Sequence, residues 1–157
     1  MVHKPKHKVH SFRGLLGDGG QDEINLERQN LNVAYRVVKF ELMGQIPGAI
    51  PQESVVKIYR ETQDSIDGVV NFTDPTLLAT AIWMKHSDVI YTLAESVVFD
   101  NILFSRNIYV THKDIEVGES CNYYIELEEV PVSASALMQL KLGVARRLNL
   151  TESPADA

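Results

Sequence analysis

The sequence is poor in cysteine and has no long apolar run. Cys121 is its only cysteine, so no disulfide can form within the chain and the fold must depend on burial and backbone pairing. No apolar segment approaches the ~20 residues of a membrane-spanning helix, and we expect no membrane partner. Residues 1–13 lack the apolar stretch of a secretory signal, so we expect the chain to be assembled in the cytoplasm.

Motifs that carry chemistry are also missing. Gly17–Gly20 has neither a lysine after the glycines nor a strand before them, so we interpret it as a flexible hinge rather than a phosphate-binding loop. Asp18, Asp22 and Glu23 lack the ligand spacing of a calcium loop. No serine lies in a nucleophile elbow. The sequence therefore predicts no enzyme, no catalytic residue and no cofactor.

The histidines offer one possible metal-binding cluster. His3, His7 and His10 have a suitable spacing, but they lie among lysines without the rigid frame that a metal site needs, so we interpret them as part of a basic tail. His86 and His112 are isolated, and each is predicted at the surface or at a strand end. We predict no metal site.

Charge is distributed unevenly along the chain. Residues 1–13 contain four basic and no acidic side chains, whereas the remaining 144 residues contain 11 basic and 21 acidic ones. An acidic body repels nucleic acid, so we expect DNA binding to be unlikely, although a basic arm that contacts DNA is an alternative. Such an arm can equally dock on an acidic protein.

From residue 31 onward, short runs with a period of two residues predict strands. Val33–Leu42 changes the parity of its apolar positions midway, which indicates a β-bulge or a strand buried on both faces. Residues 54–60 and 108–112 are further strands. Asp67-Gly68 predicts a hairpin turn before a short strand at 69–72.

Two segments allow a helix. Asp74 is a candidate N-cap before one helical turn, followed by a strand that ends near Lys85. After Pro131, alternating apolar residues predict a strand that pairs with residues 122–128 in a long hairpin, and a helix over residues 135–147 is the alternative.

Residues 122–128 give the clearest strand. Tyr123, Ile125 and Leu127 are predicted to face the core, whereas Glu126 and Glu128 face solvent. The solvated face accounts for these glutamates better than a pair of glycosidase carboxylates does. Cys121 and the single tryptophan, Trp83, are predicted in the core.

About eight or nine short strands, with turns every 8–12 residues, predict an all-β fold. We expect an antiparallel β-sandwich or a jelly-roll-like barrel at residues 31–148, an extended basic N-terminal arm at 1–30 and a polar C-terminal tail at 149–157. We expect the arm to bind a partner through Lys4, Lys6, Lys8, Phe12, Arg13, Leu15 and Leu16.

The chain resembles a family of small virion-associated structural proteins from marine tailed dsDNA bacteriophages, over roughly residues 13–147. The segments that carry the resemblance are Arg13–Gly20, Tyr35–Phe40, Val56–Tyr59, Asp67–Phe72, Ile108–His112 and Asn122–Glu128. The resemblance implies localisation in the virion as a capsid decoration or knob protein that binds the major capsid protein or another virion protein, and we expect a homo-oligomer. A tail or neck component and a carbohydrate-binding β-domain are the alternatives.

Overall fold

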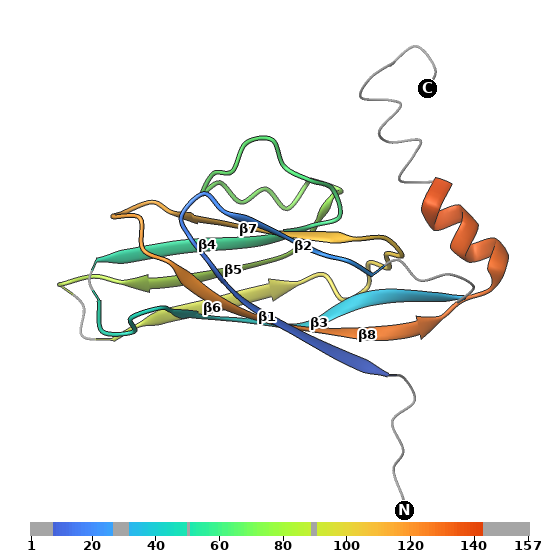
Figure 1. The fold of residues 1–157 in the computed structure, drawn as a ribbon, viewed down its shortest axis with the longest axis horizontal. Coiled ribbons are helices and arrows are strands. Elements are labelled where there is room, and N and C mark those ends of the chain that lie inside the picture. The colour runs from blue at the N-terminus through green and yellow to red at the C-terminus, as the bar shows by residue number, and fades with distance from the viewer. Residues whose placement is uncertain (1–7, 27–31, 50, 89–90, 143–157) are drawn as a thin grey trace, which may run out of the picture.

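The chain folds into two stacked antiparallel β-sheets (Figure 1). The structure is a computed structural model that describes residues 8–26, 32–49, 51–88 and 91–142. These ranges contain eight strands and a helix at residues 134–142. The strands are β1 (Val9–Leu16), β2 (Gln21–Ile24), β3 (Val33–Gly44), β4 (Gln52–Tyr59), β5 (Leu77–Lys85), β6 (Leu93–Val98), β7 (Ile108–Asp114) and β8 (Cys121–Pro131).

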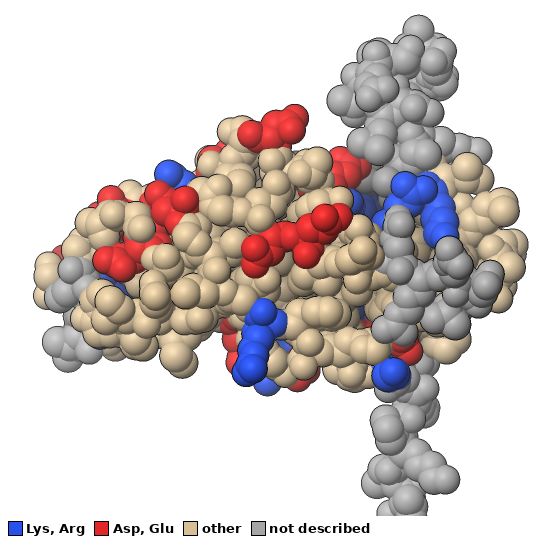
Figure 2. Space-filling model, in the orientation of Figure 1, with Lys and Arg blue, Asp and Glu red and all other residues tan. Residues whose placement is uncertain are grey.

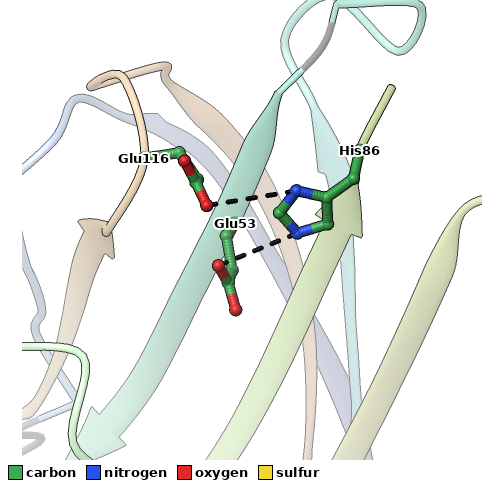
Figure 3. A group of neighbouring side chains, drawn as sticks. All are labelled: Glu53, His86 and Glu116. Atoms are coloured by element: carbon green, nitrogen blue, oxygen red, sulfur yellow. Dashed lines mark ion pairs between the residues drawn. The ribbon is translucent and has the colours of Figure 1, made fainter. Parts of the chain in front are cut away.

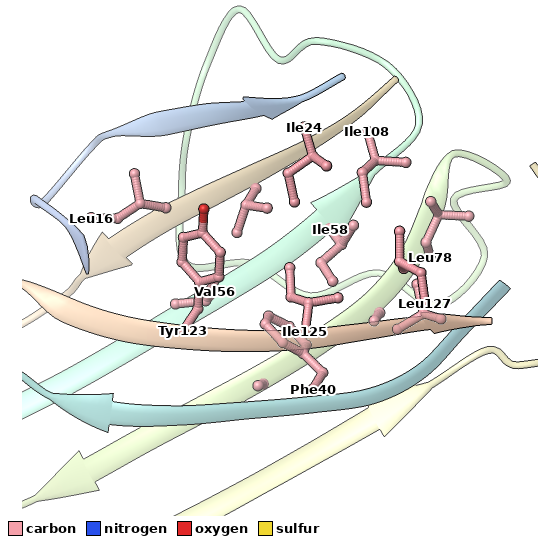
Figure 4. Packing of buried hydrophobic residues seen from close by; sticks show 14 of the residues in the cluster. Leu16, Ile24, Phe40, Val56, Ile58, Leu78, Ile108, Tyr123, Ile125 and Leu127 are labelled. Carbon is pink, nitrogen blue, oxygen red and sulfur yellow. The ribbon is translucent and has the colours of Figure 1, made fainter. Parts of the chain in front are cut away.

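The strands divide into a three-stranded sheet A, in the order β1-β8-β3, and a five-stranded sheet B, in the order β2-β7-β4-β5-β6. Every strand pair is antiparallel. The inner faces of both sheets supply one continuous apolar core (Figure 4). This arrangement confirms the prediction of an all-β antiparallel sandwich.

The period-two pattern decides which face of β8 is buried. Tyr123, Ile125 and Leu127 are buried, whereas the alternate residues Tyr124 and Glu126 are only partly buried, as predicted. The parity change in β3 is a register shift between Val37 and Lys39. It lets Val37 and Phe40 both face the core, where each is 1% exposed.

The central strand β4 is buried on both faces. Its inner face contacts sheet A, and residues 61–76 cross its outer face (Figure 1). Lys57, 3% exposed, donates from Nζ to Asp67 Oδ1 at 3.0 Å and to the carbonyl of Val69 at 2.6 Å. A lysine in a strand interior thus holds the covering segment onto the sheet.

The prediction that residues 1–30 form an arm outside the sandwich is wrong for the described part of that range. β1 pairs with β8 over eight residues, and β2 pairs with β7 over four. An edge strand buries only one face and needs few apolar residues, so its polar composition resembles that of a tail. Residues 1–7 and 27–30 lie outside the described ranges.

The glycine-rich segment between these strands is a tight crossover rather than a flexible hinge. Gly19 has a φ of 76°, a conformation that favours glycine. Its N–H donates to the carbonyl of His112 at 2.8 Å, and the His112 N–H donates to the carbonyl of Gly20 at 3.1 Å. The chain therefore passes from sheet A to sheet B while bonded to β7.

Three local predictions also differ from the structure. Residues 69–72 form no strand, and no helical turn precedes β5. Asp74 Oδ1 instead accepts bonds from the N–H and the hydroxyl of Thr76, a local turn that competes with a helix. The strand predicted after Pro131 is the alternative helix, at residues 134–142, where the Ser133 hydroxyl accepts from the N–H of Ala136.

Candidate docking surface and histidine–carboxylate cluster

Two of the predicted partner-binding residues belong to the core. Leu16 is 4% exposed, and Phe12 packs against the buried cluster from its partly buried position on β1. Both lie on the inward parity of the strand, so neither is available to anchor a partner.

Arg13 and Leu15 lie on the outward parity of β1, where Arg13 is exposed and Leu15 is 48% exposed. Lys8, which precedes the strand, is also exposed. Lys4 and Lys6 lie outside the described residues. Arg13 and Leu15 therefore project from an edge strand that, within the described ranges, pairs only with β8.

Beneath this surface, Gly14 makes room for Tyr123. The two residues are directly paired across β1 and β8, and a Cβ at Gly14 would lie 2.6 Å from the Tyr123 hydroxyl oxygen. That hydroxyl donates to Asp22 Oδ2 on β2 at 2.7 Å and so joins the two sheets. Burial, and then the neighbouring Asp22 carboxylate, raises the Tyr123 pKa.

A hollow of about 510 Å³ lies on the outer face of sheet A. The hydroxyl of Tyr124 donates to Glu126 Oε1 at 2.7 Å, and Lys39 Nζ lies 5.9 Å from the centre of the Tyr124 ring. The bond to Glu126 raises the Tyr124 pKa. Strands β1, β3 and β8 supply the lining, which is Arg13, Gly14, Glu41, Leu42, Met43, Asn122, Tyr123 and Tyr124.

We define the docking surface as this hollow together with the exposed edge of β1. It combines a cation at Arg13, an aromatic ring at Tyr124 and apolar side chains at Leu15 and Met43, which are 48% and 55% exposed. Arginine, tyrosine and methionine are enriched where proteins contact one another. The surface is therefore suited to hold another protein.

His112 is an interior residue, which corrects its predicted surface or strand-end position. It is fully buried, and its Nδ1 lies 3.0 Å from the carbonyl of Leu16 and 3.1 Å from that of Gly17. Its Nε2 lies 2.9 Å from the Ser54 hydroxyl. The imidazole therefore binds the β1–β2 crossover to β4 and has a structural role.

Glu53, His86 and Glu116 form a cluster at one end of sheet B, which corrects the prediction that His86 is isolated. The imidazole lies between the two carboxylates (Figure 3). Nε2 is 3.8 Å from Glu53 Oε2, and Nδ1 is 4.0 Å from Glu116 Oε1. The histidine side chain is 29% exposed, so the cluster is open to solvent on one side.

Sequence reasoning missed this cluster because its members are far apart in the chain. Glu53 is the second residue of β4, whereas His86 and Glu116 follow the ends of β5 and β7. Only the strand order, which places β4 between β5 and β7, brings them together. The sequence signal that could have found the cluster is the presence of polar residues at the ends of the predicted strands.

The other histidine and acidic residues considered as metal ligands bind different partners wherever the structure describes them. His10 Nε2 lies 2.9 Å from Glu129 Oε1, and His3 and His7 are outside the described residues. Asp22 binds Tyr123, whereas Asp18 Oδ1 accepts from the N–H of Asp114 at 2.8 Å. Glu23 accepts from Asn107, so these acids do not converge on a calcium ion.

Comparison of the sequence with protein-family models and with curated proteins finds no match. Among the residues that the structure describes, no helix has the length and apolar character needed to cross a bilayer.

Proposed function

We propose that the chain is a non-catalytic structural component of a tailed-phage virion, a decoration protein that binds the capsid shell through the docking surface. The observation that carries the proposal is the combination of Arg13, Leu15 and the hollow around Tyr124 on one outer face of a small sandwich. The resemblance at residues 13–147 supports it.

The charge distribution supports a protein partner. Acidic side chains are spread over the upper part of the view in Figure 2, where sheet B and residues 61–76 lie. The first 13 positions of the sequence are basic, and Arg13 among them lines the docking surface. Complementary charge steers association and selects the partner, so we expect an acidic patch on the major capsid protein.

The same asymmetry favours contact between copies. The basic N-terminal residues of one chain complement the acidic body of the next, and a homo-oligomer would present several docking surfaces to the shell. Several weak contacts made together raise the overall affinity well above that of each contact.

The first experiment measures how many copies of each variant bind to particles that lack the protein. Arg13→Glu reverses a charge in the docking surface, and we expect it to reduce occupancy by about tenfold, since losing a well-placed ionic contact costs about 1.4 kcal/mol or more. Arg106→Glu, at an exposed arginine in the segment that precedes β7 of the other sheet, is the matched charge reversal. Equal occupancy for the two variants would exclude the docking surface.

A carbohydrate-binding domain is a second candidate, because the hollow brings an aromatic ring, Tyr124, near a carboxylate, Glu41. Lys39 lies over the Tyr124 ring and has to move before a sugar can stack there. Glycan-array binding that is lost in Tyr124→Ala would favour this function, and no binding by the unmodified protein would exclude it.

A further inference from the structure

The ends of three neighbouring strands bring Glu53, His86 and Glu116 together at one end of sheet B (Figure 3). Each residue offers one ligand atom, and these atoms all lie within 4.8 Å of one another. An imidazole nitrogen and two carboxylate oxygens form a ligand set that Zn²⁺ accepts, with a fourth position left for water.

Asp114 fixes the two glutamates from behind. It is 3% exposed, and its Oδ1 accepts the backbone N–H of Glu53 at 3.0 Å and that of Glu116 at 3.1 Å. A backbone bond from Ile115 to the carbonyl of Glu53, 3.0 Å long, links the same two segments directly. Because one buried carboxylate holds both backbones, the backbone positions of the two glutamates are fixed before any ion arrives.

The distances from the His86 ring nitrogens to the two glutamates are too long for hydrogen bonds, and they leave room for an ion. His86 lies 3.8 Å from Glu53 and 4.0 Å from Glu116. Both distances exceed the upper limit of roughly 3.2 Å for an N–H···O hydrogen bond. With metal–ligand bonds of about 2.0–2.2 Å, two ligand atoms bound to one ion lie about 3–4 Å apart.

The carboxylates face different ring nitrogens, so one of them must rotate for both to reach an ion on a single nitrogen. Glu116 is the residue suited to do so, because its side chain is 36% exposed, compared with 23% for Glu53. The lysines that adjoin these strand ends bind elsewhere: Lys85 donates to the carbonyl of Pro47, and Lys113 pairs with Asp18.

We propose that Glu53, His86 and Glu116 bind one Zn²⁺ ion that joins the ends of β4, β5 and β7. The ion neutralises two neighbouring carboxylates and adds a further link between the ends of three strands that are already paired in sheet B. Its effect on the molecule is structural, since binding to the folded state raises the temperature of unfolding.

Isothermal titration calorimetry with Zn²⁺ on tag-free, full-length protein tests the proposal. His3, His7 and His10 are also potential ligands, so the reference protein carries His3→Ala, His7→Ala and His10→Ala. We expect one Zn²⁺ per chain in this reference. Adding His86→Ala or Glu116→Gln should weaken binding by at least about tenfold.

Two measurements separate loss of the site from loss of the fold. Far-ultraviolet circular dichroism must match among the variants, and in the reference protein Zn²⁺ should shift the NMR signals of the His86 ring while leaving those of the buried His112 in place. No binding by the reference protein, or binding that His86→Ala leaves unchanged, would overturn the proposal. A shift at His112 without one at His86 would do the same.

Discussion

Because Gly14 has no side chain, the Tyr123 side chain fits above it and joins the two sheets through its hydroxyl. A Cβ at position 14 would lie 2.6–2.8 Å from three atoms of the Tyr123 side chain, so that side chain would have to move and its hydroxyl would lose the bond to Asp22. We expect Gly14→Ala to lower the free energy of unfolding by about 1–3 kcal/mol, the usual cost of overpacking. Chemical denaturation measures this change.

Gly48→Ala is the matched control, because nothing lies within 4 Å of a Cβ placed there. Its stability should change by no more than about 0.5 kcal/mol, as is usual for surface substitutions. Equal effects at the two positions would show that the Tyr123 ring does not occupy the space above Gly14.

Cys121 provides a second test of the packing at a single residue. It is fully buried, and burial raises the pKa of its thiol from 9.0 to about 11. The thiol therefore stays protonated at pH 8, and we expect it to react with a disulfide reagent only after the protein is unfolded in urea. Rapid reaction of the native protein would contradict the described packing of β8.

The same shift has a consequence for stability at high pH. Because the folded-state pKa is the higher one, the contribution from this thiol is complete below about pH 9 and is lost as the pH rises toward 11. Tyr123, whose pKa is also raised by burial, acts in the same direction. We expect the melting temperature to fall above pH 9, and a flat profile would contradict both assignments.

At the scale of elements, β1 is part of the sandwich. It supplies eight paired residues and the buried Leu16, and each buried side chain of this kind contributes about 1.5–3 kcal/mol. We expect a chain that lacks residues 2–16 to lose most of its cooperative unfolding transition. Melting of the truncated chain like that of the full-length protein would contradict the assignment of β1.

The segment over sheet B depends on Lys57. The bond from Lys57 lowers the Asp67 pKa, so this contact is complete above pH 4 and is lost as the pH falls below that. We expect Lys57→Met to speed thermolysin cleavage within residues 61–76. Lys85→Met, whose lysine binds Pro47 instead, is the control and should leave the cleavage rate unchanged.

Periodicity predicted the elements that bury one face against the core. It found β8 and the parity change of β3, because side-chain alternation follows directly from strand geometry. It missed β1 and β2, whose short, polar sequences pair at sheet edges. It also favoured a strand after Pro131, where Ser133 starts a helix. After Pro131, the capping bond from the Ala136 N–H to the Ser133 hydroxyl favours the helix, and it outweighs the alternation of apolar side chains.

The candidate sites were predictable to different degrees. Arg13 and Leu15 were named from composition alone and do lie on an exposed surface, whereas Phe12 and Leu16, which were expected to bind a partner, face the core of the sandwich. The cluster around His86 depends on the order of β5, β4 and β7, which no local pattern specifies.

At the scale of the whole molecule, one sandwich presents a docking surface on sheet A, while residues 61–76 cross the outer face of β4 in sheet B. Under the proposed function, we expect sheet A, with Arg13, to face the shell and the outer face of sheet B to face solvent.

The most direct measurement is the copy number of this chain in purified phage particles, determined by quantitative mass spectrometry on DNA-filled heads separated from their tails. A decoration protein predicts a fixed ratio to the major capsid protein, with hundreds of copies retained on the heads. Absence from particles, or a few copies that leave with the tails, would contradict the account.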